Sequence, residues 1–215
     1  MIMSKIPPET RNRKGKDAFL FAKNFLNNPL RNASIMPSSS FACKAMLKGV
    51  DFSKIDSVVE LGPGTGVFSG EIVKRCRPGT KIILIELEKS YVKSLREKFD
   101  NRVSVENQSA HFLDEILKKH GIEKPDLLIS GLPFFEEAIS PHLLKTIKSL
   151  TENGTIFRFF TYMPPAVKRV YKNLPIKMLD FVLRNIPPLW IFGINWFNFT
   201  VSATRAAHSC DIRYK

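Results

Sequence analysis

The 215-residue sequence predicts one α/β domain built on a doubly wound, mostly parallel sheet with helices on both faces. Short apolar or β-branched runs alternate along the chain with segments of helical periodicity, which is the order of β-α-β units. One such run, residues 57–61, meets a glycine-rich turn at residues 62–66, and the next run, residues 81–85, ends in Glu86. Strand, glycine turn, helix, strand and acid in this order are typical of a nucleotide-cofactor half-site, in which the second acid hydrogen-bonds ribose hydroxyls.

Residues 1–50 are predicted to form a basic N-terminal part ahead of the cofactor-binding domain, residues 51–215. Apolar residues at helical spacing, with basic residues around them, predict an amphipathic helix over residues 17–27. Such a helix suits an anionic membrane surface, and equally a helix packed on the domain with a solvated basic side. Serines at 38–40 can cap a second helix, which is expected at residues 41–47.

The later elements are predicted from the alternation of strand and helix signals. One helix, residues 67–77, should follow the glycine turn, and another, residues 90–99, should follow Glu86. The run at residues 126–130 is apolar enough for a central strand of a parallel sheet. Residues 178–192 should close the sheet as an antiparallel pair, broken at Pro187-Pro188. Further strands are expected at residues 103–107 and 155–162, and further helices at residues 110–120 and 142–150.

The net charge of +13 is concentrated at both ends of the chain. Residues 1–50 carry 9 Lys/Arg and 2 Asp/Glu, residues 163–215 carry 8 and 2, and residues 51–162 carry 16 of each sign. Basic flanks around a neutral core favour a polyanionic partner, either an anionic membrane surface or nucleic acid. The alternative is a charge excess that only keeps the protein soluble.

Cysteine use and hydropathy favour a cytoplasmic protein without a disulfide framework. Cys43, Cys76 and Cys210 are scattered and lack metal-ligand spacing, so no metal is expected. Charges and Pro7-Pro8 near the start leave no apolar core for a signal peptide, so none is expected. No apolar stretch reaches the ~18 residues of a membrane-spanning helix.

The spacing of the glycine turn distinguishes between cofactors. Dinucleotide sites use G-x-G-x-x-G with a helix N-terminus facing a pyrophosphate, whereas here the glycines run G-x-G-x-G behind Glu60. A carboxylate in that place repels a pyrophosphate and suits an ammonium group. The run ELGPGTG resembles the first motif of class I S-adenosylmethionine-dependent methyltransferases, which implies a Rossmann-like fold. In that resemblance Glu60 helps to hold the cofactor's amino group, directly or through water, and Glu86 takes the ribose hydroxyls. The alternative is a tight strand-to-helix turn in another α/β protein.

The end of the fourth predicted strand should carry the acceptor chemistry, because ligands of open α/β sheets bind at the carboxyl ends of the strands. This strand ends in SGLPF, residues 130–134. Amino-methylating members of the superfamily, including adenine methyltransferases of DNA and rRNA, carry a motif like N-P-P-Y or N-L-P-Y there. Their Asn carbonyl accepts a hydrogen bond from the target amine, and serine has no such carbonyl. The turn therefore favours a simple primary amine oriented by backbone carbonyls; a plain proline-bearing loop is the alternative.

Methyl transfer to an amine needs alignment and a neutral nitrogen. A free alkylamine is mostly protonated near pH 7, so the site must accept a proton or depress the amine's pKa by desolvation. Tyr162, His142 and Glu137 are the candidate proton acceptors, and no spacing singles one of them out.

Taken together, the ends and the core resemble bacterial phospholipid N-methyltransferases, which convert phosphatidylethanolamine stepwise towards phosphatidylcholine at the cytoplasmic membrane. The resemblance covers most of the chain and is carried by residues 25–30, 35–39, 60–66, 130–133, 160–162 and 184–188. It implies a peripheral protein on the inner face of the cell membrane, with residues 17–27 docked on anionic lipid.

The resemblance also implies the site residues. The cofactor site would comprise Glu60, Gly62, Pro63, Gly64, Thr65, Gly66, Glu86, Ser109, Ala110 and Ser130, and the catalytic set Ser130, Gly131, Leu132, Pro133 and Tyr162. One departure concerns residues 108–110, which read QSA where the family usually has GDA, so Ser109 replaces the aspartate that would bind the adenine amino group. An rRNA or DNA adenine N-methyltransferase is the second hypothesis, and a non-catalytic lipid- or nucleic-acid-binding module is the third.

Overall fold

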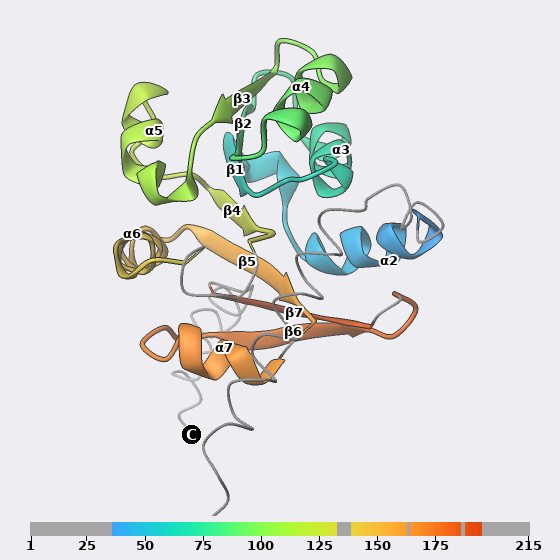
Figure 1. Ribbon diagram of the computed structural model, residues 1–215, viewed down its shortest axis with the longest axis vertical. Helices are drawn as coiled ribbons and strands as arrows, with labels where there is room; N and C mark the ends of the chain where they lie inside the picture. The colour runs from blue at the N-terminus through green and yellow to red at the C-terminus, as the bar shows by residue number, and fades with distance from the viewer. Residues whose placement is uncertain (1–35, 133–138, 163, 186–187, 195–215) are drawn as a thin grey trace, which may run out of the picture.

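The computed structural model describes residues 36–132, 139–162, 164–185 and 188–194 (Figure 1). Its centre is a seven-stranded sheet of order β3-β2-β1-β4-β5-β7-β6. All pairs formed among strands β1 to β5 are parallel, while β7 pairs with both β5 and β6 in antiparallel fashion. The predicted α/β class, the mostly parallel sheet and the antiparallel closing pair are therefore confirmed. The strands are β1 (Ser57–Leu61), β2 (Lys81–Glu86), β3 (Val103–Asn107), β4 (Leu127–Ser130), β5 (Ile156–Thr161), β6 (Lys177–Val182) and β7 (Leu189–Ile194).

Helices cover both faces of the sheet, as predicted (Figure 1). One face carries α5 (Leu113–Lys119), α6 (Pro141–Glu152) and α7 (Pro164–Val170), and the other carries α2 (Met36–Met46), α3 (Val67–Arg75) and α4 (Lys89–Lys98). Two short 3-10 turns, η2 (Phe52–Lys54) and η3 (Ala110–Phe112), complete the described elements.

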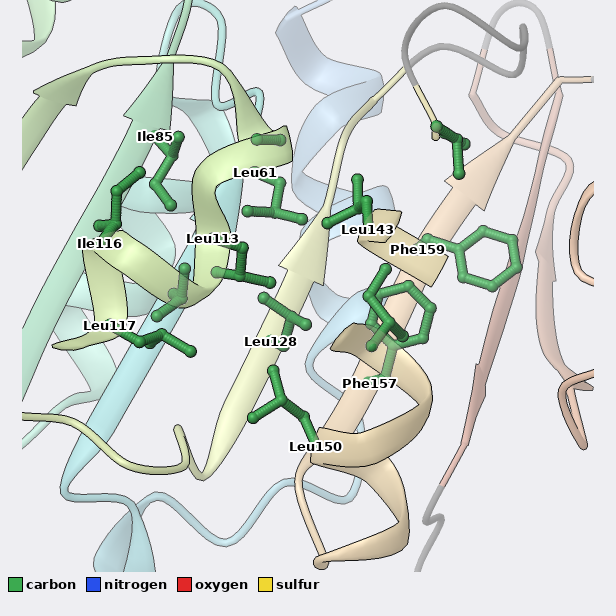
Figure 2. Close-up of a cluster of buried hydrophobic side chains, with 14 of the residues drawn as sticks. Leu61, Ile85, Leu113, Ile116, Leu117, Leu128, Leu143, Leu150, Phe157 and Phe159 are labelled. Atoms are coloured by element: carbon green, nitrogen blue, oxygen red, sulfur yellow. The ribbon is translucent and has the colours of Figure 1, made fainter. Parts of the chain in front are cut away.

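Each face has its own hydrophobic core. Figure 2 shows the core on the α5–α6 side, where Leu128 and Phe157 of the central strands meet Leu113 and Leu150 of the helices. Strands β1 and β4 are buried on both faces, which is why their sequences are mostly apolar. Each large apolar side chain buried in this way contributes roughly 1.5–3 kcal/mol. The strands are therefore a rigid base for the loops at their carboxyl ends.

Two predicted helices differ from the structure, and one observed helix is not predicted. The helix expected at residues 110–120 is divided into η3 and α5. The helix expected at residues 41–47 begins earlier, at Met36. Helix α7 was not predicted at all, because its seven residues, which start with two prolines, are too few to show a period. The helix expected over residues 17–27, and the basic arm before it, lie outside the described residues.

A buried arginine ties α2 to the sheet. Arg158 of β5 is 2% exposed, and its Nη1 donates to the carbonyl of Met46 and, at 2.8 Å, to that of Lys48. Carbonyls at the end of a helix have no partner within the helix, and a cation there also interacts favourably with the negative end of the helix dipole. Burial lowers the pKa of Arg158 to about 10, so the guanidinium stays charged at neutral pH.

Arg158→Met is therefore expected to lower the free energy of unfolding by roughly 2–4 kcal/mol, because the end of α2 loses a charged donor. Urea denaturation measures this. The matched control is Arg77→Met, which removes an exposed ion pair with Asp56 and should cost at most about 1 kcal/mol. Similar losses in the free energy of unfolding for the two variants would contradict the role of Arg158 in holding α2 to the sheet.

Candidate active site

The loop after β1 is fixed from two sides. Its three glycines have φ angles of 65°, 56° and 71°, in the left-handed region. Lys98 of α4 donates from Nζ to the carbonyl oxygens of Thr65 and Gly66, each at 3.0 Å. The N–H of Gly64 donates to Oε2 of Glu86 at 3.0 Å. A Cβ at Gly64 would meet nothing within 4 Å, so the backbone here faces open space and a ligand can approach it closely.

Glu60 lies beneath this loop and is 1% exposed. Ser69 of α3 donates to its Oε2 at 2.6 Å. Burial raises the pKa of Glu60 to about 7, against the opposing hydrogen bond from Ser69; the charge of Glu86 adds to the rise and Lys98 opposes it. Pro63 of the loop is buried as well. The charge that Glu60 would offer to an ammonium group therefore depends on pH near neutrality.

Glu86 stands at the end of β2 and uses both carboxylate oxygens. Oε2 accepts from the loop, and Oε1 accepts from the N–H of Glu88 at 2.9 Å. Asn107, at the end of β3, donates from Nδ2 to the carbonyls of Glu86 and Leu87, both at 3.0 Å. This contact fixes the strand exit and leaves Leu87 69% exposed beside the carboxylate. Sequence reasoning missed Asn107 and Lys98; a polar residue closing an apolar strand is the signal that could have found Asn107.

Ser109 caps the turn after β3. Its Oγ accepts from the N–H of His111 at 3.3 Å and begins η3. Serine and aspartate are both good N-caps, so Ser109 preserves the turn in which the resembling family has aspartate. The side chain of Ala110 packs into the core, whereas that of Phe112 is 45% exposed.

Ser109→Asp is expected to tighten S-adenosylmethionine binding about tenfold, because a carboxylate at the cap adds a charged acceptor for the adenine amino group. Calorimetry measures the Kd. Ser149→Asp, on α6, adds the same charge away from the loops and should leave the Kd unchanged. Unchanged or weaker binding by Ser109→Asp would mean that residue 109 does not face the adenine.

The turn after β4 packs directly on the glycine loop. The N–H of Gly131 donates to the carbonyl of Leu61 at 2.8 Å, and a Cβ on Gly131 would lie 2.7 Å from the carbonyl oxygen of Gly62. Ser130 is 2% exposed, and its Oγ accepts from the N–H of Leu132 at 3.3 Å. The predicted residues on β1 and β4 are therefore brought together.

A cluster of three half-buried aromatic rings approaches this turn through Phe160. Phe160 of β5 would lie 3.6 Å from a Cβ on Gly131. Its ring centroid is 5.3 Å from that of Phe68 and 5.9 Å from that of Tyr162, which meets it edge-on. Tyr162 also hydrogen-bonds Asn185, which follows β6. The faces of such rings attract cations, so the cluster suits an amine that becomes an ammonium ion.

The candidate proton acceptors are dispersed. His142, the second residue of α6, faces Asp114 of α5 at 3.4 Å, in a surface groove of about 660 Å³ between the two helices. Burial raises the pKa of Tyr162, so its hydroxyl stays protonated near neutral pH and is no base. Glu137, and Pro133 of the catalytic set, lie outside the described residues. Desolvation beside the aromatic rings would also keep an amine neutral, without a proton acceptor.

The donor set fits S-adenosylmethionine. Gly64 offers open backbone, Glu86 offers a carboxylate at the strand end for ribose hydroxyls, and Glu60 lies under the loop for an ammonium group. In the part of the chain that the structure describes, His, Cys, Asp and Glu form no cluster suited to a metal ion. Nor does any helix of that part have the length and apolar character needed to cross a bilayer.

Comparison with known sequences identifies lipid and ribosomal RNA methyltransferases among the relatives of this chain. The family described as ribosomal RNA adenine dimethylase matches residues 15–134. An ornithine lipid N-methyltransferase of Singulisphaera acidiphila is 32% identical over 179 residues, covering 80% of this chain and 93% of that protein. A ribosomal RNA small subunit methyltransferase A of Mycoplasma mycoides is 31% identical over 103 residues, covering 46% of this chain and 36% of that protein. The chain thus spans nearly the whole lipid enzyme and about a third of the rRNA enzyme.

Solved structures agree on the fold. A dimethyladenosine transferase from Plasmodium falciparum matches with a TM-score of 0.53 at 15% identity, covering 71% of this chain and 60% of that chain. Fibrillarin from Aeropyrum pernix, with natively bound S-adenosyl-L-methionine, matches with a TM-score of 0.51 at 16% identity, covering 72% and 74%. At these identities the likeness concerns the fold alone, and it is the Rossmann-like methyltransferase fold that the sequence predicts.

Proposed function

We propose that this chain, which belongs to the ribosomal RNA adenine dimethylase family of S-adenosylmethionine-dependent methyltransferases, methylates the primary amine of a membrane lipid. Two headgroups are the candidates. The sequence resemblance implies phosphatidylethanolamine, converted towards phosphatidylcholine, and the relative from Singulisphaera acidiphila is named for ornithine lipid. Both headgroups end in a primary amine, which is the shared chemistry of the proposal.

The observation that carries the proposal is that position 130 holds a serine whose hydroxyl is buried and hydrogen-bonded. Adenine-methylating relatives are expected to hold the base through an Asn carbonyl at this position, whereas Ser130 has only a hydroxyl. That hydroxyl is buried and already accepts a hydrogen bond from the N–H of Leu132. A terminal alkylamine is small enough to be oriented by backbone carbonyls without a side-chain amide.

In the proposed reaction the amine nitrogen bonds to the methyl carbon while the bond from that carbon to sulfur breaks. The bound cofactor supplies the methyl group on a sulfonium. Glu86 and the backbone at Gly64 would position the ribose and methionine parts, and Gly131 keeps the β4 turn close to the loop. The rings of Phe68, Phe160 and Tyr162 would desolvate the amine and stabilise the ammonium product.

Methylation of an adenine in rRNA is the second candidate function. It is favoured by the description of the matching family and by the net charge of +13. The lipid function is favoured by the coverage of the lipid relative, 93% of which the chain spans, against 36% of the rRNA relative.

Transfer of labelled methyl groups tests the two against each other. The full chain is incubated with methyl-labelled S-adenosylmethionine and three acceptors in parallel: phosphatidylethanolamine vesicles, ornithine lipid vesicles and small-subunit rRNA. Label is expected in at least one of the two lipid fractions and not in the RNA. Label in the RNA alone would contradict the proposal.

Ser130→Asn sharpens this test. Because position 130 is 2% exposed, the larger side chain should disturb the turn and lower lipid methylation at least about tenfold, without creating activity on rRNA. Ser130→Ala removes the hydroxyl without adding volume and should cost only a few-fold. A gain of rRNA methylation in Ser130→Asn would favour the adenine enzyme instead.

A further inference from the structure

Large apolar side chains are exposed around one end of the closing strand pair. Phe41 of α2 is 38% exposed, Phe181 near the end of β6 is 42% exposed, and Leu183 just beyond it is 69% exposed. Helix α2 packs against β6, and in Figure 1 both reach the right of the view. These three side chains, together with Trp190 and Arg184, are called the turn surface below.

The turn surface lies at the reactive edge of the sheet. Thr161, the last residue of β5, pairs with Trp190 of β7, which in turn pairs with Phe181. Since β5 runs parallel to β4, this end of β5 lies on the same edge as the turn that carries Ser130. The hydrogen bond between Tyr162 and Asn185 joins the aromatic cluster beside Gly131 to the chain that follows β6.

The chemistry of the turn surface combines aromatic rings with a cation. The rings of Phe181 and Trp190 are 4.8 Å apart, and the guanidinium of Arg184 lies over the ring of Phe41 at 5.1 Å. Aromatic residues and arginines with apolar neighbours are typical of side chains at a membrane–water interface. In sequence, residues 163–215, which include Arg184, carry 8 basic and 2 acidic residues, and this excess of positive charge complements an anionic lipid surface.

We propose that the turn surface docks on an anionic lipid bilayer, with Phe181 and Leu183 entering the headgroup region. The proposal rests on a lipid being the substrate. Docking at this edge would bring a headgroup amine, still held in the bilayer, towards the aromatic cluster beside Gly131. The guanidinium of Arg184 could pair with the phosphates of an RNA backbone, but an exposed Leu183 would make no favourable contact with them. A lipid surface therefore explains more of the residues in the turn surface.

Vesicle flotation tests the proposal with vesicles of phosphatidylglycerol and phosphatidylcholine. The double variant Phe181→Ser/Leu183→Ser of the full chain is expected to partition into the vesicle fraction at least about tenfold less than the unchanged chain, because two apolar side chains no longer leave water. The matched control is Met178→Ser, on the same strand, since Met178 is 60% exposed but lies at the opposite end of β6. This control should partition within about twofold of the unchanged chain. Arg184→Gln should weaken binding to anionic vesicles and leave binding to neutral ones unchanged.

Two outcomes would overturn docking through the turn surface: equal partitioning of the double variant and the unchanged chain, or loss of rRNA binding by the double variant with vesicle binding intact. Methylation of a short-chain aminolipid dispersed in detergent separates this result from the proposed function. If the turn surface only docks, the double variant retains this activity while losing activity on vesicles. If neither protein methylates the dispersed lipid but partitioning still differs, docking stands and the proposed substrate fails.

Discussion

Glu86→Gln is expected to weaken S-adenosylmethionine binding about 100-fold. The carboxylate at the end of β2 would accept hydrogen bonds from both ribose hydroxyls, and each such bond to a charged group contributes about 1.5–3 kcal/mol. The same carboxylate accepts from the N–H groups of Gly64 and Glu88, so an amide loses part of the loop's support as well. Calorimetry gives the Kd directly.

Glu88→Gln is the control for this substitution. Glu88 is exposed, lies two residues further along the chain and caps α4 by accepting from the N–H of Ser90 at 3.2 Å. Its amide variant changes the same charge at the same strand exit and should keep the Kd within about threefold. A Glu86→Gln variant that binds as tightly as this control would remove Glu86 from the cofactor site.

Glu60 is expected to make cofactor binding depend on pH. Burial raises the pKa of this carboxyl to about 7, with Glu86 of β2 adding to the rise and Ser69 of α3 and Lys98 of α4 opposing it. The cofactor's ammonium group prefers the ionised carboxylate and stays protonated up to about pH 7.7. Affinity should therefore rise between about pH 5.5 and pH 7, by up to tenfold per unit. Glu60→Gln should bind about tenfold more weakly at pH 7.5 and lose this dependence.

The stability of the protein without cofactor should change in the opposite direction. In the unfolded chain Glu60 loses its proton near its ordinary pKa of 4.5, but in the folded protein only near 7. Between these values the folded state binds more protons, so the free energy of unfolding falls as pH rises, by about 3 kcal/mol across the window. Glu60→Gln should remove this fall, so the variant that binds cofactor poorly should be at least as stable as the unchanged chain at pH 8.

Glu71→Gln, in α3, controls for the loss of a carboxylate. Glu71 is partly exposed and pairs with Arg75, so its amide variant should retain the pH dependence of both cofactor binding and stability. If the Kd of the unchanged chain does not vary from pH 5.5 to pH 7, Glu60 does not contact the ammonium group.

Much of the fold could be predicted because its signals are local. The central strands are buried on both faces, so their sequences are mostly apolar runs, and the glycine turn indicates where the first crossover helix begins. The position of β7 between β5 and β6 could not be predicted, since strand order depends on pairing between distant segments. Nor could the role of Arg158, a single charge in an apolar strand, whose carbonyl partner Met46 lies 112 residues away.

The residues of the candidate site could be predicted where their position in a sequence pattern indicates one role. Glu60 and Glu86 follow from the glycine-turn pattern; in the structure Glu86 accepts from the N–H of Gly64, and the buried Glu60 accepts from Ser69. Lys98 could not be singled out, because at the end of α4 it reads as one more solvated lysine, yet it holds two loop carbonyls. In sequence Ser109 only departs from the aspartate of the resembling family, whereas in the structure its hydroxyl retains the capping function that aspartate would have.

The most direct test of the account is mass spectrometry of headgroup fragments from the lipids of cells that express the chain. The account predicts aminolipid headgroups that carry one or more added methyl groups, which Glu86→Gln and Ser130→Asn reduce and Glu88→Gln does not. The fragment masses also tell phosphatidylethanolamine from ornithine lipid. An unchanged set of lipid headgroups, together with dimethyladenosine appearing in small-subunit rRNA, would contradict it.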